Sequence, residues 1–143
     1  ALEEVEADYE RAAADLEQAR AGGDVDQLRY RSTLARRTDM RVNALRALPS
    51  RESFPLHLQA LRIGSLAMIA FPGEPFAEIG VEIRKRSPHA LTMVSGYSNG
   101  TFGYIPTRDA YPLGGYGVDD SLIAPGGAEA LTDGATALLA EIA

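Results

Sequence analysis

The 143-residue sequence contains no cysteine, no tryptophan and only two histidines. Without cysteine the chain has no disulfide framework, no thiol nucleophile and no zinc–thiolate site. No stretch approaches the roughly twenty apolar residues that a membrane-spanning helix needs. We therefore expect no transmembrane segment. The length fits one modest domain that can bury a core without covalent staples.

Basic residues are also scarce, because the 14 lysine and arginine residues are outnumbered by 20 aspartate and glutamate residues. The resulting net charge of −6 argues against a nucleic-acid surface and favours solubility. No signal peptide is visible, and the chain begins at Ala1 rather than at a methionine. We expect a processed or truncated piece of a longer protein, and the sequence does not distinguish a cytoplasmic from a secreted location.

The first fifty residues show the apolar spacing of two helices. Residues 2 to about 21 form the first, Gly22 and Gly23 end it, and Asp24 with Gln27 is a capping pair for the second, which runs to about Leu48. The first helix holds seven acids against two bases, whereas the second carries six arginines. The opposite charges predict a helical hairpin over residues 1–50, and they make a basic nucleic-acid-binding helix the weaker interpretation.

From Phe54 the pattern changes to that of strands and one further helical crossover. Residues 54–64 and 65–71 read as two strands joined by a tight turn at Gly64. The second is apolar without strict alternation, as expected for a strand covered on both faces. The remaining elements are a helix from Pro75 to Arg86, a strand over 90–96, a short turn near 107–111 and a last helix over 128–142.

These elements predict an α/β fold: a helical hairpin, a β-hairpin, a β-α-β crossover and a C-terminal helix. Residues 1–143 then form a single domain or a fragment of one, with 51–143 as the α/β part. A crossover between parallel strands brings the ends of both strands to one edge of the sheet, where open α/β folds bind ligands. Glu74 follows the first of these strands and Tyr104 follows the second. The topology therefore predicts that the two side chains share one rim.

The residues around Glu74 suggest that it is unusual. Pro75 suits the first position of a helix, which would place Glu74 at the cap. Caps are normally Ser, Thr, Asp or Asn, so a glutamate there breaks a local rule and points to function. The alternative is a solvated carboxylate that interacts with the positive end of the helix dipole. Spacing alone leaves both interpretations open.

Two other patterns are weaker. Gly96 to Gly100 fits G-x-S-x-G, but a nucleophile elbow must run directly into a helix and be followed by its acid and its histidine. Gly103 and Pro106 prevent an immediate long helix, and no histidine follows His89. A nucleophilic Ser98 is therefore disfavoured. His89 begins its strand at the opposite rim from Glu74, and His57 is a lone strand histidine, so neither is a strong ligand candidate.

Glu74 and Tyr104 could share a hard metal ion. A carboxylate is an ordinary zinc ligand, while a phenol joins only where the ion lowers its pKa far below about 10. Catalytic zinc takes about three protein ligands plus water, usually including histidine. The Glu74 and Tyr104 oxygens would therefore complete only about half of the coordination sphere of a catalytic zinc.

Four runs of residues carry a resemblance to a known family: Leu58–Gly64, Ala70–Glu74 (AFPGE), Ser95–Asn99 (SGYSN) and Gly103–Thr107 (GYIPT). Over residues 54 to 127 the chain resembles the end of the catalytic domain of the neutral/alkaline, non-lysosomal ceramidases, including bacterial relatives of unassigned substrate. The resemblance implies that Glu74 and Tyr104 are zinc ligands. It also implies that Asn99 and Tyr116 belong to loops near the substrate.

The chain also departs from the family's pattern. The family's two zinc histidines and its catalytic serine lie upstream of anything present here, so no catalytic residue is assigned in this chain. Pro75-Phe76 stands where the family usually has Phe-Thr. This difference argues against the family's ceramide-binding surface in this chain, but it leaves the assignment of Glu74 as a ligand in place. The resemblance implies a C-terminal piece of a zinc-dependent N-acyl amide hydrolase acting on a small-molecule or lipid amide.

Two expectations and two alternatives follow from these interpretations. The chain alone should hold zinc weakly and be inactive, whereas its parent should bind zinc tightly. A sheet separated from upstream partners should expose an edge or an apolar face, and so should self-associate or pack against the missing part. The alternatives are a non-catalytic binding or interaction module, and a metal hydrolase of a different amide or ester.

Overall fold

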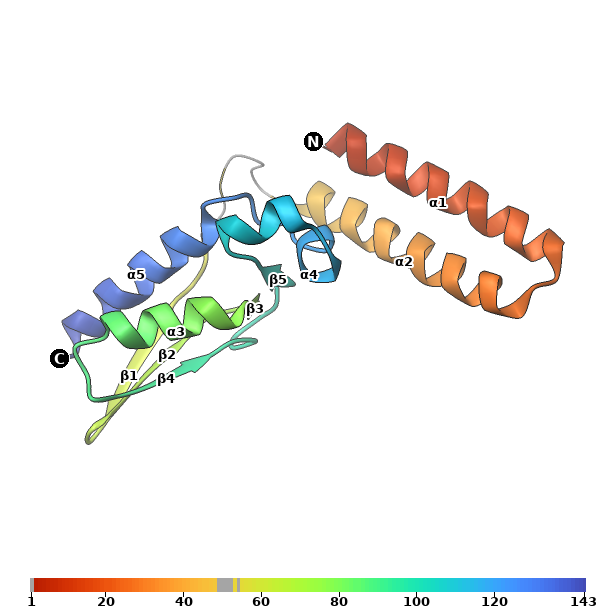
Figure 1. Cartoon of the computed structure of the whole chain (residues 1–143). Coiled ribbons are helices and arrows are strands. Elements are labelled where there is room, and N and C mark those ends of the chain that lie inside the picture. The colour runs from red at the N-terminus through yellow and green to blue at the C-terminus, as the bar shows by residue number, and fades with distance from the viewer. Residues whose placement is uncertain (1, 49–52, 54) are drawn as a thin grey trace. The chain divides into compact units, whose positions relative to one another are not determined.

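A computed structural model describes residues 2–48, 53 and 55–143. The chain divides into two compact units, Ala1–Phe54 and Pro55–Ala143. The first is helical, and the second contains the described strands, three α-helices of different length and a 3₁₀ helix (Figure 1). The expected α/β fold, with a helical hairpin followed by a small sheet and a C-terminal helix, is confirmed.

The first unit is a hairpin of α1 (Leu2–Gly22) and α2 (Val25–Ala47). Asp24 caps α2, because its side chain accepts from the backbone N–H groups of Asp26 and Gln27 at 2.9 and 3.1 Å. The opposite charges of the helices meet as expected: Arg31 pairs with Asp15 at 2.5 Å and Arg46 with Glu6 at 2.7 Å. Small and β-branched side chains are buried between the helices (Val5, Ala12, Ala35, Val42).

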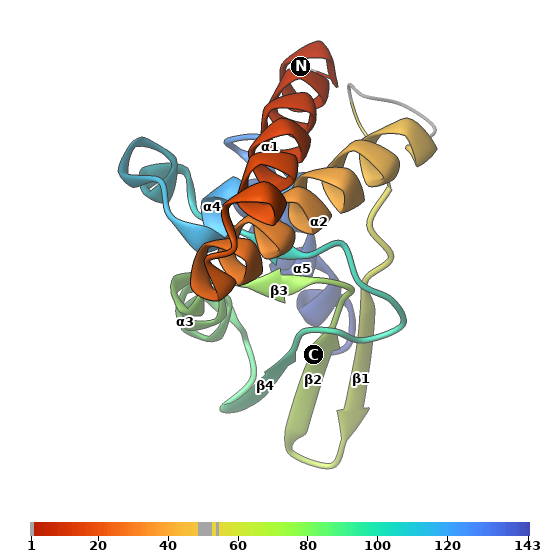
Figure 2. The same ribbon diagram turned by 90° about the vertical axis from the view of Figure 1, so that its right-hand side faces the viewer.

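The main sheet of the second unit has the order β1-β2-β4, which can be followed in Figure 2. β1 (Gln59–Ile63) and β2 (Leu66–Ala70) form the expected β-hairpin around Gly64. β4 (Leu91–Ser95) pairs in parallel with β2 after the helix α3 (Ala77–Arg86), which confirms the β-α-β crossover. The first strand is shorter than expected, since residues 55–58 precede it; Phe54 lies outside the described residues.

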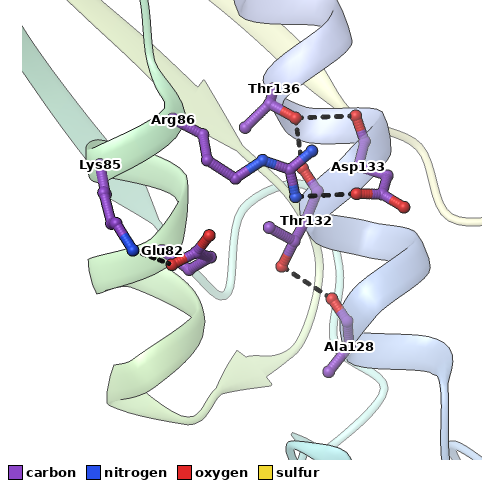
Figure 3. Close-up of polar contacts among 7 residues, drawn as sticks. All are labelled: Glu82, Lys85, Arg86, Ala128, Thr132, Asp133 and Thr136. Atoms are coloured by element: carbon purple, nitrogen blue, oxygen red, sulfur yellow. Dashed lines mark hydrogen bonds and ion pairs between the residues drawn. The ribbon is translucent and has the colours of Figure 1, made fainter.

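Two helices lie side by side against one face of this sheet. α3 contacts β4, and α5 (Gly127–Glu141) contacts β1, β2 and α3. Figure 3 shows the two helices linked by Arg86 and Asp133, whose Nη1 and Oδ1 atoms are 2.8 Å apart. The core between these layers is fully buried and apolar, and includes Ile69, Phe71, Ile83, Ile105 and Leu139.

The opposite face of the sheet is apolar but exposed. Register places Leu61, Met68 and Met93 in one row, and Ile63, Leu66 and Leu91 in the next. We call these six residues the open sheet face. Five of them are between 37% and 66% exposed. The expectation that β2 is covered on both faces is therefore wrong, because within residues 55–143 helices pack against its Ala67 and Ile69 side alone.

Short elements complete the second unit. β3 (Glu74–Pro75) pairs with β5 (Tyr104–Ile105) as a separate two-stranded sheet. A 3₁₀ helix, η1 (Arg108–Leu113), and a single helical turn, α4 (Tyr116–Asp119), follow β5. Among the described residues, no helix combines the length and apolar character needed to cross a bilayer.

Candidate functional site

Glu74 and Tyr104 lie directly opposite each other. They are Cα partners in the parallel pairing of β3 with β5. Glu74 N–H donates to the Gly103 carbonyl at 2.8 Å, and Phe76 N–H donates to the Ile105 carbonyl at 3.1 Å. Opposed residues of paired strands project to the same face of a sheet. The structure thus brings together the two residues that the topology argument had placed on one rim.

The prediction that Glu74 is an unusual helix cap is wrong, however. Glu74 does not cap the helix, and Pro75 is not its first residue. The N-cap of α3 is Phe76, which makes no side-chain capping bond. The helix begins two residues later than expected because the N–H groups of Glu74 and Phe76 bond instead to the carbonyls of Gly103, just before β5, and of Ile105 in β5. Glu74 is therefore held by strand pairing, and the helix-dipole alternative loses the geometry on which it depended.

The loop after β4 holds the turn that carries Glu74. Tyr97 N–H donates to the Gly73 carbonyl at 2.8 Å, and Ser98 N–H donates to the Phe71 carbonyl at 3.1 Å. The approach is so close that a Cβ atom at Gly96 would lie 2.9 Å from the Gly73 oxygen. Glycine at position 96 is thus a steric requirement of this contact.

Tyr97 is a residue of the site that the sequence interpretation missed. Its hydroxyl donates to Glu74 Oε2 at 2.5 Å. The bond to the Glu74 carboxylate, with smaller contributions from desolvation and negative charge, raises the pKa of Tyr97 to about 12. Its position just beyond the end of β4, at the edge where Glu74 follows β2, is the one signal that could have identified it.

Tyr104 lies among aromatic rings as well as beside Glu74. Its ring packs edge-to-face with Tyr116 at 5.4 Å between centroids and with Phe76 at 6.5 Å. Desolvation raises the pKa of the Tyr104 phenol, and the negative charge of Glu74 raises it further. Gly117 allows this packing, since a Cβ there would lie 2.7 Å from the Phe76 ring. Tyr116, one of the two predicted substrate-loop residues, thus contacts a predicted ligand.

Asn99, the other predicted loop residue, is engaged elsewhere. Its side-chain amide donates to Gln59 Oε1 at 3.1 Å, at the start of β1. Its φ angle of 62° lies in the left-handed region, which asparagine tolerates better than most residues. Asn99 therefore links the loop after β4 to β1, whereas Tyr97 links the same loop to Glu74.

Ser98 and the two histidines lie away from strand interiors, and the expectation that His57 and His89 belong to strands is wrong because they precede β1 and β4. The next regular element after Ser98 is β5, so the G-x-S-x-G run is not a strand-to-helix elbow. Ser98 Oγ lies 3.0 Å from Ser95 Oγ and bonds to nearby carbonyls. His89 Nε2 lies 2.9 Å from the Leu139 carbonyl of α5, and His57 is exposed in the segment before β1. Each has a structural explanation.

The donor set at Glu74 fits part of a metal site. It combines a carboxylate with a phenol, and both are oxygen donors that suit a hard cation. Within residues 2–48, 53 and 55–143, no group of three or more His, Cys, Asp or Glu side chains could hold a metal ion. Glu74 and Tyr104 could contribute two oxygen ligands, whereas a catalytic zinc takes about three protein ligands.

Comparison with protein-family models, with curated proteins and with solved structures gave no match.

Proposed function

We propose that this chain supplies two oxygen ligands to the zinc site of an N-acyl amide hydrolase that resembles the neutral ceramidases. The observation that carries the proposal is the pairing of Glu74 with Tyr104 across β3 and β5. The family resemblance singled out these two residues, which are thirty positions apart in the sequence. Their direct opposition in the fold supports a common ligand more strongly than either motif alone.

In this proposal the Glu74 carboxylate and the Tyr104 phenol hold the zinc ion together with two histidines from outside the chain. A bound zinc supplies Lewis-acid chemistry, polarising the amide carbonyl and lowering the pKa of a bound water. The chain's own contribution is to place the oxygens. Backbone pairing of β3 with β5 fixes the Glu74 and Tyr104 Cα positions, and Tyr116 restricts the Tyr104 ring from one side.

The Glu74 carboxylate affects the ionisation of the neighbouring Tyr104 phenol. Without a cation the Glu74 carboxylate opposes ionisation of Tyr104, which is one cause of its raised pKa. A phenol becomes a good ligand only when a cation reverses this effect. We therefore expect weak zinc binding and no activity from the chain alone, and tight binding from the parent.

The substrate in this proposal is a small-molecule or lipid amide, with Tyr116 and Asn99 on the loops nearest to it. Tyr116 is 59% exposed next to Tyr104, so it can contact a molecule bound at the zinc. A different amide or an ester would meet the same groups, because the carbonyl chemistry is shared. The proposed substrate class is thus the acylated amine or alcohol, with the N-acyl amide preferred on the resemblance.

A second candidate function is a non-catalytic interaction module, and the open sheet face is the observation that favours it. Contiguous exposed apolar residues mark interaction surfaces in soluble proteins. The same face would equally be covered by a second copy or by upstream parts of a hydrolase, so it does not oppose the first proposal. Under the module proposal, however, Glu74 has no ligand to bind.

Zinc titration followed by backbone NMR separates the two. The enzyme proposal predicts that zinc shifts the amide signals of Glu74 and Tyr104 at millimolar concentration, and that Glu74→Gln and Tyr104→Phe each abolish those shifts. Glu78→Gln is the matched control, since Glu78 is an exposed carboxylate four residues away on α3. Tight binding that survives Glu74→Gln would show that the site is wrong.

The gene itself offers a second test. An open reading frame that continues for a few hundred residues upstream and encodes histidine-bearing strands would support the hydrolase. A frame that starts near Ala1 would refute it and leave the interaction module.

A further inference from the structure

Tyr97 has a backbone conformation that bulky residues rarely adopt. Its φ angle is 52°, in the left-handed region. For an aromatic residue this conformation carries an energetic cost, and such residues persist only where the surrounding structure fixes them. They are concentrated at functional sites, so the contacts that hold Tyr97 in place are informative.

Those contacts all lead to the turn before Glu74. The Tyr97 N–H donates to the Gly73 carbonyl at 2.8 Å, and the next residue, Ser98, donates to the Phe71 carbonyl. Gly96 permits the approach, because any Cβ there would clash with the Gly73 oxygen and the Pro75 ring. The backbone of residues 96–98 is thus docked on residues 71–75 at a fixed distance.

The side chain of Tyr97 then bonds to the same turn. Its hydroxyl donates to Glu74 Oε2 at 2.5 Å. The Tyr97 side chain is not buried, since the residue is 60% exposed, and its hydroxyl could bond to water instead. Because Tyr97 holds Gly73 through its backbone and Glu74 through its side chain, the orientation of the carboxylate is fixed relative to the turn.

We infer that Tyr97 is a positioning residue for Glu74: it holds the carboxylate by Oε2 in the orientation in which Glu74 and Tyr104 together serve a cation. Carboxylates that bind metals are themselves hydrogen-bonded, and loss of such a partner typically weakens metal affinity by about 10- to 100-fold. The functional part of this inference rests on the proposed zinc role of Glu74. The orienting part concerns the metal-free chain and stands by itself.

The orienting part is tested on the metal-free 143-residue chain by NMR three-bond couplings that report the χ1 angle of Glu74. The expected result is one dominant rotamer in the wild type and averaged couplings in Tyr97→Phe, which lacks only the hydroxyl. Tyr30→Phe is the matched control, because Tyr30 is likewise 60% exposed and lies in the other unit. Averaged couplings in the wild type, or unchanged couplings in Tyr97→Phe, would overturn the inference.

The functional part is tested by zinc titration of the same variants, followed at the amides of Glu74 and Tyr104. Tyr97→Phe should weaken the apparent affinity about 10-fold or more, whereas Tyr30→Phe should leave it unchanged. If Glu74→Gln abolishes binding but Tyr97→Phe binds like the wild type, the inference fails and the proposed function stands. If Glu74→Gln binds zinc normally, the proposed function fails, while the rotamer measurement still decides the orienting role.

A further variant distinguishes positioning from simple structural support. Asparagine tolerates the left-handed conformation, so Tyr97→Asn should keep the docked backbone while removing the phenol. The positioning role predicts weakened zinc binding, with a thermal midpoint no lower than that of Tyr97→Phe, which loses the same hydroxyl bond. A lowered midpoint with unchanged zinc affinity would show that Tyr97 serves only the fold.

Discussion

The Ser121 hydroxyl donates to the backbone carbonyl of Tyr104 at 2.9 Å. Ser121 is 6% exposed and lies seventeen residues after Tyr104, beyond α4. The same hydroxyl accepts from the Ile123 N–H at 3.0 Å. One buried side chain therefore joins β5, which carries a proposed zinc ligand, to the segment that leads into α5.

We expect Ser121→Ala to destabilise the second unit by about 1–3 kcal/mol, because it removes the hydroxyl partner of two part-buried backbone groups, the Tyr104 carbonyl and the Ile123 N–H. Urea unfolding followed by circular dichroism measures the change. Thr33→Ala is the control, since the Thr33 hydroxyl bonds to Arg29 on the exposed surface of α2 and its loss should change stability by less than about 0.5 kcal/mol. Equal effects of the two substitutions would contradict the structural role of Ser121.

A methyl group added at Gly96 should be more damaging than one added at an open glycine. The new Cβ would lie 2.9 Å from both the Gly73 oxygen and the Pro75 Cδ atom. Relieving this overlap requires the loop after β4 to move away from the turn, at a cost of about 1–3 kcal/mol. Gly22→Ala is the control because a Cβ there meets nothing within 4 Å.

The measurement for this pair is the urea midpoint together with the Tyr97 and Glu74 amide shifts. Gly96→Ala should lower the midpoint and move both signals, whereas Gly22→Ala should leave both signals in place. A Gly96→Ala protein with wild-type shifts at Tyr97 would show that the docking of this loop is looser than the structure indicates.

Much of this architecture was predictable, because it is encoded over many residues. Opposite charges on two helical segments predicted the hairpin, and the ion pairs of Arg31 with Asp15 and Arg46 with Glu6 are formed. The apolar strands on either side of α3 predicted a parallel crossover. Each of these inferences rested on a repeated pattern, so one atypical residue could not overturn it.

The site was harder to predict because its features are short or distant in sequence. A two-residue strand such as β3 has no periodicity, so the sequence pattern places Glu74 at the N-cap and Pro75 at the first position of the helix that follows. The bond from Tyr97 to Glu74 spans 23 positions and depends on a left-handed backbone angle that tyrosine rarely adopts. The juxtaposition of Glu74 with Tyr104 was nevertheless expected, because it follows from topology rather than from local preference.

The ionisation of Tyr97 should depend on Glu74. In the folded chain the pKa of Tyr97 is raised to about 12 from an ordinary value of 10. Because the folded-state pKa is the higher one, the contribution of this bond to stability is fully present below pH 10. It is lost as the pH rises from 10 through about 12. The bond therefore stabilises the protein throughout the neutral range.

Ultraviolet titration of tyrosinate measures this effect. Subtracting the titration curve of Tyr97→Phe from that of the wild type isolates the ionisation of Tyr97 from that of the other five tyrosines in the chain. That difference should titrate near pH 12 in the native background and closer to pH 10 in a Glu74→Gln background. Glu78→Gln should leave the titration unchanged, and a Tyr97 that ionises near pH 10 in the native background would contradict the bond.

The open sheet face should make the α/β unit self-associate. Leu61 and Met93 lie in the same row of this face, in register with Met68 between them, and are 44% and 47% exposed. Covering such a row with a second copy removes apolar area from water at about 25 cal/mol per Å², which favours association. Multi-angle light scattering over a range of concentrations should therefore show an average mass that rises above that of the monomer.

A single lysine in the row should reverse this behaviour. Leu61→Lys places a charge where the second copy would pack, and burying that charge without a partner is costly, so the variant should remain a monomer at concentrations where the wild type associates. Val81→Lys is the matched control, because Val81 is an exposed apolar residue on α3, at 56%, and lies outside the open sheet face. Two outcomes would show that this face does not drive association. In one, the wild type stays monomeric at high concentration; in the other, Val81→Lys is as monomeric as Leu61→Lys.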